Sequence, residues 1–421
     1  MIKIDIKKLL FSKSFLQLKY RTKSNQAIKS INEKYKNWQL DFLKVDNIVN
    51  TKKINEYVKN KKDKYENIVV LWIWWSALWT RAIMQGLKGK YYNELSRKKR
   101  WDNPKLYILD NIDPDEINYL LETIKLKETL FIVISKSGWT IETVSMFSFF
   151  KKLIKKENLK LIDHFTIIAW ETSDFKEKCL KKWYDVFDVP DWIGGRFSAF
   201  TDVWLLPLAF IWVDIEKILS WLSSIKKTLL SDNIFENPAL LTSIIQYHTY
   251  FELNKNITVF FPYSTNLFYL WEWYKQMIWE SLGKWWIWVT LTSAIWVTDQ
   301  HSQLQLYYDW PNDKLITFLE VEDFWVDFKI DKEEKLSFKE LLDTSKFWTE
   351  ESISSYNKIN YTIKIDKINE KTLWELIAML ETQTAILWEF YGFNPFDQPW
   401  VEIWKKITRK KLSEDLWEIK F

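Results

Sequence analysis

Short apolar runs rich in β-branched residues alternate with longer amphipathic segments along most of the chain. Continuous apolar runs are typical of strands that are buried on both faces. The segments between them, such as Pro114–Lys127 and Thr140–Lys156, repeat apolar residues at helical spacing. Alternating strands and helices predict an α/β protein with parallel sheets covered by helices on both faces. In the first half, the predicted strands are Ile68–Ile73, Leu106–Leu109, Leu130–Ile134, Phe165–Ala169 and Val186–Val189.

The same alternation begins again near Asn256, after a predicted helix at Pro238–Tyr250. In the second half, the predicted strands are Ile257–Phe261, Trp288–Leu291, Leu315–Val321 and Tyr361–Ile365. A chain of 421 residues is too long for one hydrophobic core, so two domains are expected. The pattern predicts an N-terminal helical segment (1–60), two three-layer α/β domains (61–215 and 216–398) and a C-terminal helix (399–421).

The turn after the first predicted strand is built from tryptophan. Trp72, Trp74, Trp75 and Trp79 lie where a ligand-binding turn normally needs glycine. The chain has 28 Trp and 7 Gly, whereas glycine usually makes up about 7% of a protein, or roughly 29 residues at this length. The hypothesis is that most Trp positions are glycine in the native protein, through a UGA codon read as tryptophan. The alternative is a chain that is truly rich in tryptophan.

Charge and cysteine content exclude several classes of protein. The 60 basic and 56 acidic residues give a net charge of +4 and are scattered, so no nucleic-acid surface is predicted. The single cysteine, Cys179, excludes a disulfide within the chain and fits a reducing cytoplasm. No membrane span or secretory signal is predicted. Three histidines and one cysteine have no metal-ligand spacing, so no metal is expected.

Five motifs follow one another in a fixed order. They are VLWIWWSALWTR (Val70–Arg81), SKSGWTIET (Ser135–Thr143), DVPDWIGGRFS (Asp188–Ser198), EWYKQMIWESLGK (Glu272–Lys284) and, near the C-terminus, NPFDQPWVEIWKK. Within the first three, the segments SALWT, SKSGWT and GGRFS begin where a predicted strand ends, which is where open α/β sheets bind ligands. With glycine at the turn tryptophans, the ordered set resembles the phosphoglucose isomerase family over about 330 residues. The resemblance implies two sugar isomerase (SIS) domains.

The second motif has the composition of an anion site. Ser135, Ser137 and Thr140 crowd the start of a predicted helix, where hydroxyls and free backbone N–H groups favour an anion. Lys136 adds a positive charge. A hydroxyl-rich helix cap is the alternative explanation. The resemblance implies that this turn binds the sugar phosphate and that Ser76 also faces it.

The acid–base residues are implied by the resemblance alone. An aldose–ketose isomerase needs a base near the substrate, a group that opens the sugar ring and positive charge near the developing oxyanion. The family's base matches Glu280, and Gln276 matches the glutamine one helical turn before it. The ring-opening histidine matches His301, and the positively charged groups match Arg196 and Lys405. This chemistry requires no cofactor.

The resemblance implies a cytoplasmic enzyme that interconverts D-glucose 6-phosphate and D-fructose 6-phosphate through a cis-enediol. It also implies a homodimer in which His301 is supplied across the interface. One alternative is an isomerase that also accepts mannose 6-phosphate. Another is a non-catalytic, sugar-phosphate-binding regulator built on SIS domains. The presence of Glu280, His301 and Lys405 together favours an enzyme.

Overall fold

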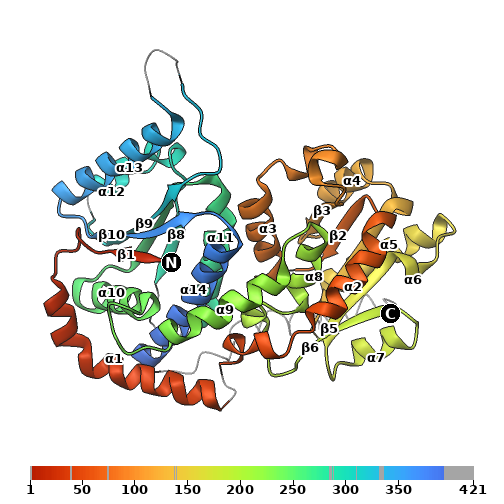
Figure 1. Cartoon of the computed structure of the whole chain (residues 1–421), viewed down its shortest axis with the longest axis horizontal. Coiled ribbons are helices and arrows are strands. Elements are labelled where there is room, and N and C mark those ends of the chain that lie inside the picture. The colour runs from red at the N-terminus through yellow and green to blue at the C-terminus, as the bar shows by residue number, and fades with distance from the viewer. Residues whose placement is uncertain are drawn as a thin grey trace. The chain divides into compact units, whose positions relative to one another are not determined.

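The computed structural model describes residues 2–37, 40–73, 75–136, 138, 140–283, 287, 289–309, 311–330 and 336–392. The described residues form two compact units. Unit 1 contains the chain up to Leu43, Gln85–Leu87 and the residues from Ser220 onward, and unit 2 contains Lys44–Met84 and Lys88–Leu219. Each unit has one five-stranded sheet (Figure 1).

The sheet of unit 2 is entirely parallel, with the strand order β3-β2-β4-β5-β6. Every residue of β2, β4 and β5 is buried, because helices cover both faces of the sheet. The five predicted strands of the first half are confirmed. Their bounds are β2 (Asn67–Leu71), β3 (Lys105–Leu109), β4 (Thr129–Ser135), β5 (Phe165–Trp170) and β6 (Asp185–Val189).

The helices of unit 2 complete a three-layer arrangement. On one face, α4, α5 and α7 pack on the sheet through a core in which Phe131 and Phe165 stack beside Phe147. On the other face, α8 contacts β2, β6 and α2. The helices are α2 (Thr51–Lys61), α3 (Trp75–Lys88), α4 (Pro114–Thr123), α5 (Ile141–Lys156), α6 (Leu161–His164), α7 (Asp174–Leu180) and α8 (Asp202–Phe210).

The sheet of unit 1 has the order β1-β10-β9-β7-β8 and contains one strand that was not predicted. The strand β1 (Lys3–Asp5) pairs antiparallel with β10, Ile4 facing Ile363. Three residues are too few to show the alternating pattern of a strand. The prediction that residues 1–60 are helical was therefore wrong at Lys3–Asp5. The other strands are parallel: β7 (Ile257–Pro262), β8 (Thr290–Ser293), β9 (Lys314–Asp323) and β10 (Asn360–Lys367).

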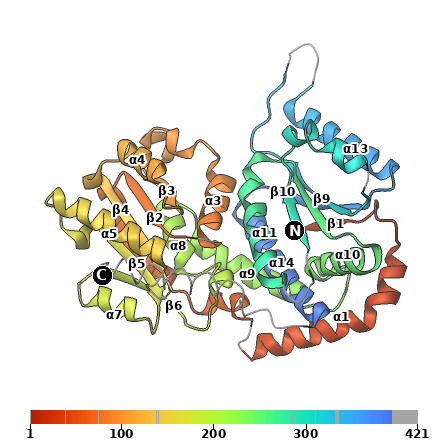
Figure 2. The ribbon, with the colours of Figure 1, turned by 180° about the vertical axis from the view of Figure 1, so that it is seen from behind.

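Helices also cover both faces of this sheet (Figure 2). The long helix α14 packs against α1, α10 and α11 on one face. On the other, Leu304, Leu342 and Ile353 of α12 and α13 pack against Phe261 and Phe318. The helices are α1 (Lys13–Lys36), α9 (Ile215–Leu229, which contains the boundary between the units), α10 (Pro238–Leu253), α11 (Phe268–Leu282), α12 (Leu304–Tyr308), α13 (Phe338–Ser355) and α14 (Glu370–Tyr391). The α/β fold class is confirmed.

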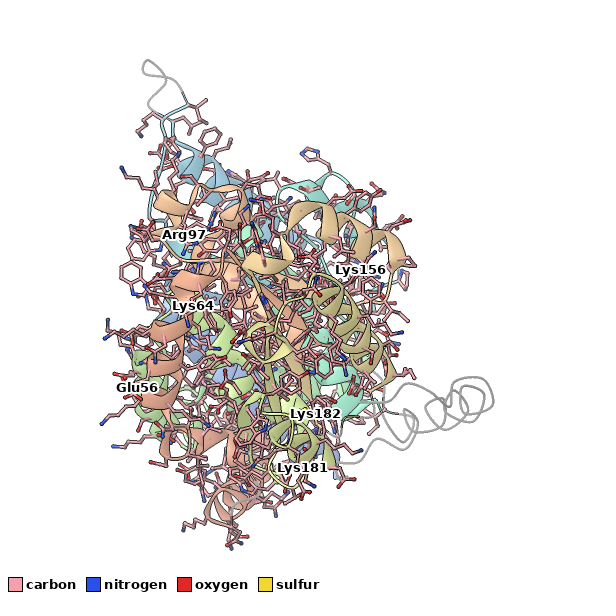
Figure 3. All side chains as sticks on the ribbon, turned by 90° about the vertical axis from the view of Figure 1, so that its right-hand side faces the viewer. Glu56, Lys64, Arg97, Lys156, Lys181 and Lys182 are labelled. Carbon is pink, nitrogen blue, oxygen red and sulfur yellow. The ribbon has the colours of Figure 1, made fainter. Side chains whose placement is uncertain are left out.

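Charged side chains are spread over several elements of unit 2 rather than gathered on one. The residues labelled in Figure 3 include Glu56 on α2, Arg97 beyond α3, Lys156 at the end of α5 and Lys181 after α7. No helix among the described residues is long and apolar enough to cross a membrane.

Candidate active site

A tight polar turn joins β4 to α5. Ser135 is the last residue of β4 and is buried, and its Oγ accepts a hydrogen bond of 3.0 Å from the backbone N–H of Gly138. Gly138 has a φ of +71°, and a Cβ at this position would lie 2.6 Å from the Cβ of Phe175. Both the backbone conformation and the available space therefore require glycine. This glycine turns the chain directly from the strand into the helix.

The N-terminus of α5 is open. Thr140 is the N-cap residue with an extended backbone, but its side chain makes no capping hydrogen bond. The first N–H groups of any α-helix lack partners within the helix, and its dipole favours an anion at this end. Lys136 lies just before the helix; desolvation lowers its pKa, an effect that Asp191 opposes. Ser137 lies outside the described residues.

Two further predicted residues follow strands of the same sheet. The backbone of Ser76 lies in the first turn of α3, which follows β2, while its side chain is outside the described part of the structure. Arg196 lies in a 3-10 helix (Gly195–Phe197) after β6 and is buried. Because β2, β4 and β6 run parallel, Ser76, Ser135 and Arg196 all follow the carboxyl edge of one sheet.

Asp202 is a titratable group at this edge that sequence reasoning missed. It is the first residue of α8, which begins a few residues after Arg196. Burial raises the pKa of its carboxyl to about 7; Lys53 opposes this shift, and Asp188 adds to it. An aspartate in the first turn of a helix is ordinary in sequence, so nothing in the sequence signals the burial.

The predicted base lies in unit 1. Gln276 and Glu280 are half-buried on α11, and Nε2 of Gln276 donates to Oε1 of Glu280 at 3.3 Å. Earlier on the same helix, Glu272 accepts a hydrogen bond of 2.9 Å from Oγ of Ser293 and pairs with Lys275 at 2.7 Å. Ser293 is the last residue of β8, so this part of α11 lies beside the carboxyl end of that strand. Glu280 lies about 12 Å further along the helix axis.

His301 follows the carboxyl end of β8 and is exposed. Asp299 shapes the turn before it by accepting hydrogen bonds from the N–H of Ile295 at 2.5 Å and from Oγ of Ser302 at 2.8 Å. The side chain of His301 makes no hydrogen bond or ion pair with any described residue. The structure therefore does not join Glu280 to His301 within this unit. Lys405, the remaining predicted residue, lies outside the described residues.

Within the described ranges, no group of three or more His, Cys, Asp or Glu side chains is arranged to hold a metal ion.

Comparison with known proteins decides the family. The profile of the family described as phosphoglucose isomerase matches residues 17–300. The chain belongs to the phosphoglucose isomerase family. It is 39% identical over 402 residues to a probable glucose-6-phosphate isomerase of Methanococcus maripaludis, covering 94% of this chain and 89% of that protein. It is 34% identical over 423 residues to the glucose-6-phosphate isomerase of Carboxydothermus hydrogenoformans, covering 95% and 91%.

Solved structures share this phosphoglucose isomerase fold. A hypothetical protein from Thermus thermophilus has a TM-score of 0.87 at 26% identity and covers 98% of this chain and 100% of its own. A glucose-6-phosphate isomerase from Chlamydia trachomatis has a TM-score of 0.75 at 22% identity and covers 87% and 74%. At that identity the second likeness speaks for the fold alone. The family match and the sequence relatives, rather than the Chlamydia trachomatis structure, confirm the resemblance to the family.

Proposed function

We propose that the chain is a glucose-6-phosphate isomerase that interconverts D-glucose 6-phosphate and D-fructose 6-phosphate. The family match over residues 17–300 carries this proposal. The open N-terminus of α5 supports it, because an uncapped helix end beside Ser135 and Lys136 suits a phosphate group. An assay of the purified protein with fructose 6-phosphate tests it. Phosphate binding without isomerisation would favour a sugar-phosphate-binding regulator instead.

In this proposal, unit 2 holds the phosphate of the substrate. Ser76, Ser135, Ser137 and Thr140 offer hydroxyls, and the first-turn N–H groups of α5 offer donors. Lys136 contributes positive charge. Gly138 keeps the turn tight enough for backbone and phosphate to approach one another. Competition by inorganic phosphate is the expected result, and its absence would contradict this assignment.

In the chemical step, Glu280 takes the proton from C2 of the open-chain aldose. The electrons of the C–H bond form the C1–C2 double bond, and O1 gains the negative charge and takes up a proton to become a hydroxyl. Glu280 then returns its proton to C1, while the hydroxyl on C2 releases a proton and becomes the carbonyl, so the proton gained at O1 balances the one lost at O2. Gln276 holds Oε1 of the base through its amide. Arg196 and Lys405 stabilise the oxyanion, and His301 opens the ring.

We further propose a homodimer in which His301 serves the site of the partner subunit. Two observations on this chain support it: His301 is exposed, and its side chain makes no polar contact with a described residue. Mixing inactive Glu280→Gln and His301→Ala proteins after dissociation should restore activity, because a hybrid dimer has one site with both native groups. Inactive mixtures in which mass analysis finds hybrid dimers would overturn the arrangement.

A further inference from the structure

A cleft of about 560 Å³ lies at the amino edge of the sheet in unit 1. Lys255 precedes β7, Asn312 precedes β9 and Ile359 precedes β10, and all three line the cleft. Its outer wall comes from Phe11 and Phe15, at the start of α1. The motifs that imply isomerisation play no part in this cleft. Its volume falls within the range of small-molecule sites.

A buried histidine faces this cleft. His248 is only 5% exposed and lines the cavity. Its Nδ1 lies 2.7 Å from the hydroxyl of Tyr20, and its ring has no other hydrogen-bond partner among the described residues. Burial raises the pKa of Tyr20 well above its ordinary value and lowers the pKa of His248, which favours the uncharged form of both groups. When Tyr20 donates to Nδ1, the ring proton is on Nε2, which can donate to a ligand.

Positive charge gathers at the same edge. Lys255, Lys314 and Lys358 are 5%, 8% and 9% exposed. Lys314 pairs with the Asp313 carboxylate at 2.6 Å, whereas the ammonium groups of Lys255 and Lys358 donate to the backbone carbonyls of Asn312 and Asp309. Burial, followed by Lys358, lowers the pKa of Lys255, and the Asp313 carboxylate, which makes its ion pair with Lys314, opposes this shift without accepting a hydrogen bond from Lys255 among the described contacts. Buried ammonium groups that meet carbonyls rather than carboxylates favour a bound anion.

The wall beside these polar groups is apolar. The rings of Phe11 and Phe15 meet the His248 ring edge-on, with centroids 4.7 and 5.4 Å away. Leu10 and Leu253 extend this surface. An apolar wall facing a buried ammonium and an imidazole suits a molecule with an apolar body and one acidic group.

We propose that this cleft binds a small amphiphilic organic anion. Its acidic group faces Lys255 and His248, and its apolar body rests on Phe11, Phe15 and Leu253. The site is distinct from the proposed phosphate site, which follows the carboxyl edge of the other sheet.

The dye 8-anilino-1-naphthalenesulfonate, which is aromatic and carries one sulfonate, is a suitable probe. Its fluorescence should rise on titration with native protein, and Lys255→Gln and Phe11→Ala should each weaken binding at least tenfold. Lys255→Arg keeps the charge and should recover much of the loss. Lys314→Gln is the matched control, since Lys314 does not line the cleft, and its affinity should stay within about threefold. Isomerase activity should be unchanged in the Lys255 variants.

Three results would overturn the proposal. One is equal dye affinity in Lys255→Gln and native protein. Another is displacement of the dye by fructose 6-phosphate, which would move it to the substrate site. The third is the absence of dye binding by folded native protein, which would mean that the cleft is closed, for example between two copies of the chain.

Three exposed tryptophans occupy backbone positions that favour glycine. Trp101, Trp183 and Trp212 have φ values of 52°, 62° and 60°. The backbone N–H of Trp183 donates to the carbonyl of Leu180, and the N–H of Tyr184 donates to the carbonyl of Cys179. This is the Schellman helix ending, and the same pair of bonds recurs at Trp101 and Trp212. Glycine, or sometimes asparagine, takes the left-handed position in this motif, as at Asn158 and Asn357 of this chain.

The geometry points to glycine at Trp101, Trp183 and Trp212 in the native protein. This observation is independent of the count of residues and of the motifs. Peptide mass spectrometry of protein isolated from its source should find glycine at all three positions, and an intact mass well below the written 51.3 kDa. Tryptophan in those peptides would overturn the inference. The measurement does not depend on folding or activity.

Discussion

Helices at equivalent places in the two units differ in how their N-termini are capped. In unit 2, β4 pairs with β2 and leads into α5; in unit 1, β9 pairs with β7 and leads into α13. The N-cap of α5, Thr140, makes no side-chain capping bond. The N-cap of α13, Ser337, accepts from the N–H of Glu340, and the Glu340 carboxylate accepts from the N–H of Ser337 at 2.7 Å.

The difference lies at the third helical position. The Glu340 carboxylate accepts a hydrogen bond at the N-terminus of α13 and places a negative charge there. This charge disfavours the binding of an anion at the same helix end. The matching residue in α5 is Thr143, which has no charge. Glu142, the acidic residue in the first turn of α5, makes no side-chain hydrogen bond to a described residue. Topology therefore supplies two helix ends beside parallel sheets, and one side chain separates a structural end from a candidate phosphate site.

The largest expected effect would separate chemistry in unit 1 from binding in unit 2. Glu280→Gln should lower kcat by about 10²- to 10⁴-fold, because the amide keeps the shape but cannot take the proton. KM should change little, since the phosphate contacts proposed for unit 2 remain. Steady-state kinetics measure both. Glu272→Gln, on the same helix but paired with Lys275, is the control and should retain most of kcat.

Thr143→Glu should close the open helix end of α5. The new carboxylate can complete a capping box with Thr140 and repel the phosphate, raising KM between about tenfold and a hundredfold. Thr143→Gln is the matched control, because it offers a similar cap without charge. Because Thr143 is buried, either substitution could destabilise the fold, and thermal melts of both variants measure that effect separately from KM. Equal KM values for the Glu and Gln variants would argue against an electrostatic site here.

Asp202→Asn should alter the pH dependence of stability at the carboxyl edge of unit 2. The folded pKa of about 7 exceeds the ordinary 3.8, so the folded state binds more protons between these pH values. The free energy of unfolding of the native chain should therefore fall as pH rises from about 4 to 7. At pH 8 the variant should be more stable by up to about 4 kcal/mol, the free-energy equivalent of this shift, and near pH 4 most of this gain should vanish. Urea denaturation at several pH values measures this, and a gain that is the same at pH 4 and 8 would contradict it.

The smallest effect concerns the closed end of α13. Glu340→Ala removes half of the capping box and should lower the free energy of unfolding by about 1 kcal/mol. KM for fructose 6-phosphate should stay unchanged, because this helix end is not proposed to bind substrate. Chemical denaturation and kinetics on the same preparation test both points. A raised KM would mean that the two helix ends are less different than their caps indicate.

The sequence by itself determined the α/β class, the strands of both sheets except β1, and the family. Buried strands such as β4 are continuous apolar runs, so their pattern is local and readable. The turn at Gly138 was also predictable, because glycine after an apolar strand run and before a helix start marks a turn, whereas its close approach to Phe175 is a tertiary feature. The roles of Glu280, His301, Arg196 and Lys405 stay predictions carried by family membership.

Only the tertiary structure decided features that depend on distant partners. β1 is a strand because β10, more than 300 residues later, offers it an edge. Asp202 titrates near neutral pH because the folded chain buries it near Asp188, and burial cannot be read from one residue type. The cleft beside His248 exists because α1, α10 and the starts of three strands meet at one edge. Local patterns encode backbone preference, but charge, burial and cavities arise from contacts between segments that the sequence keeps far apart.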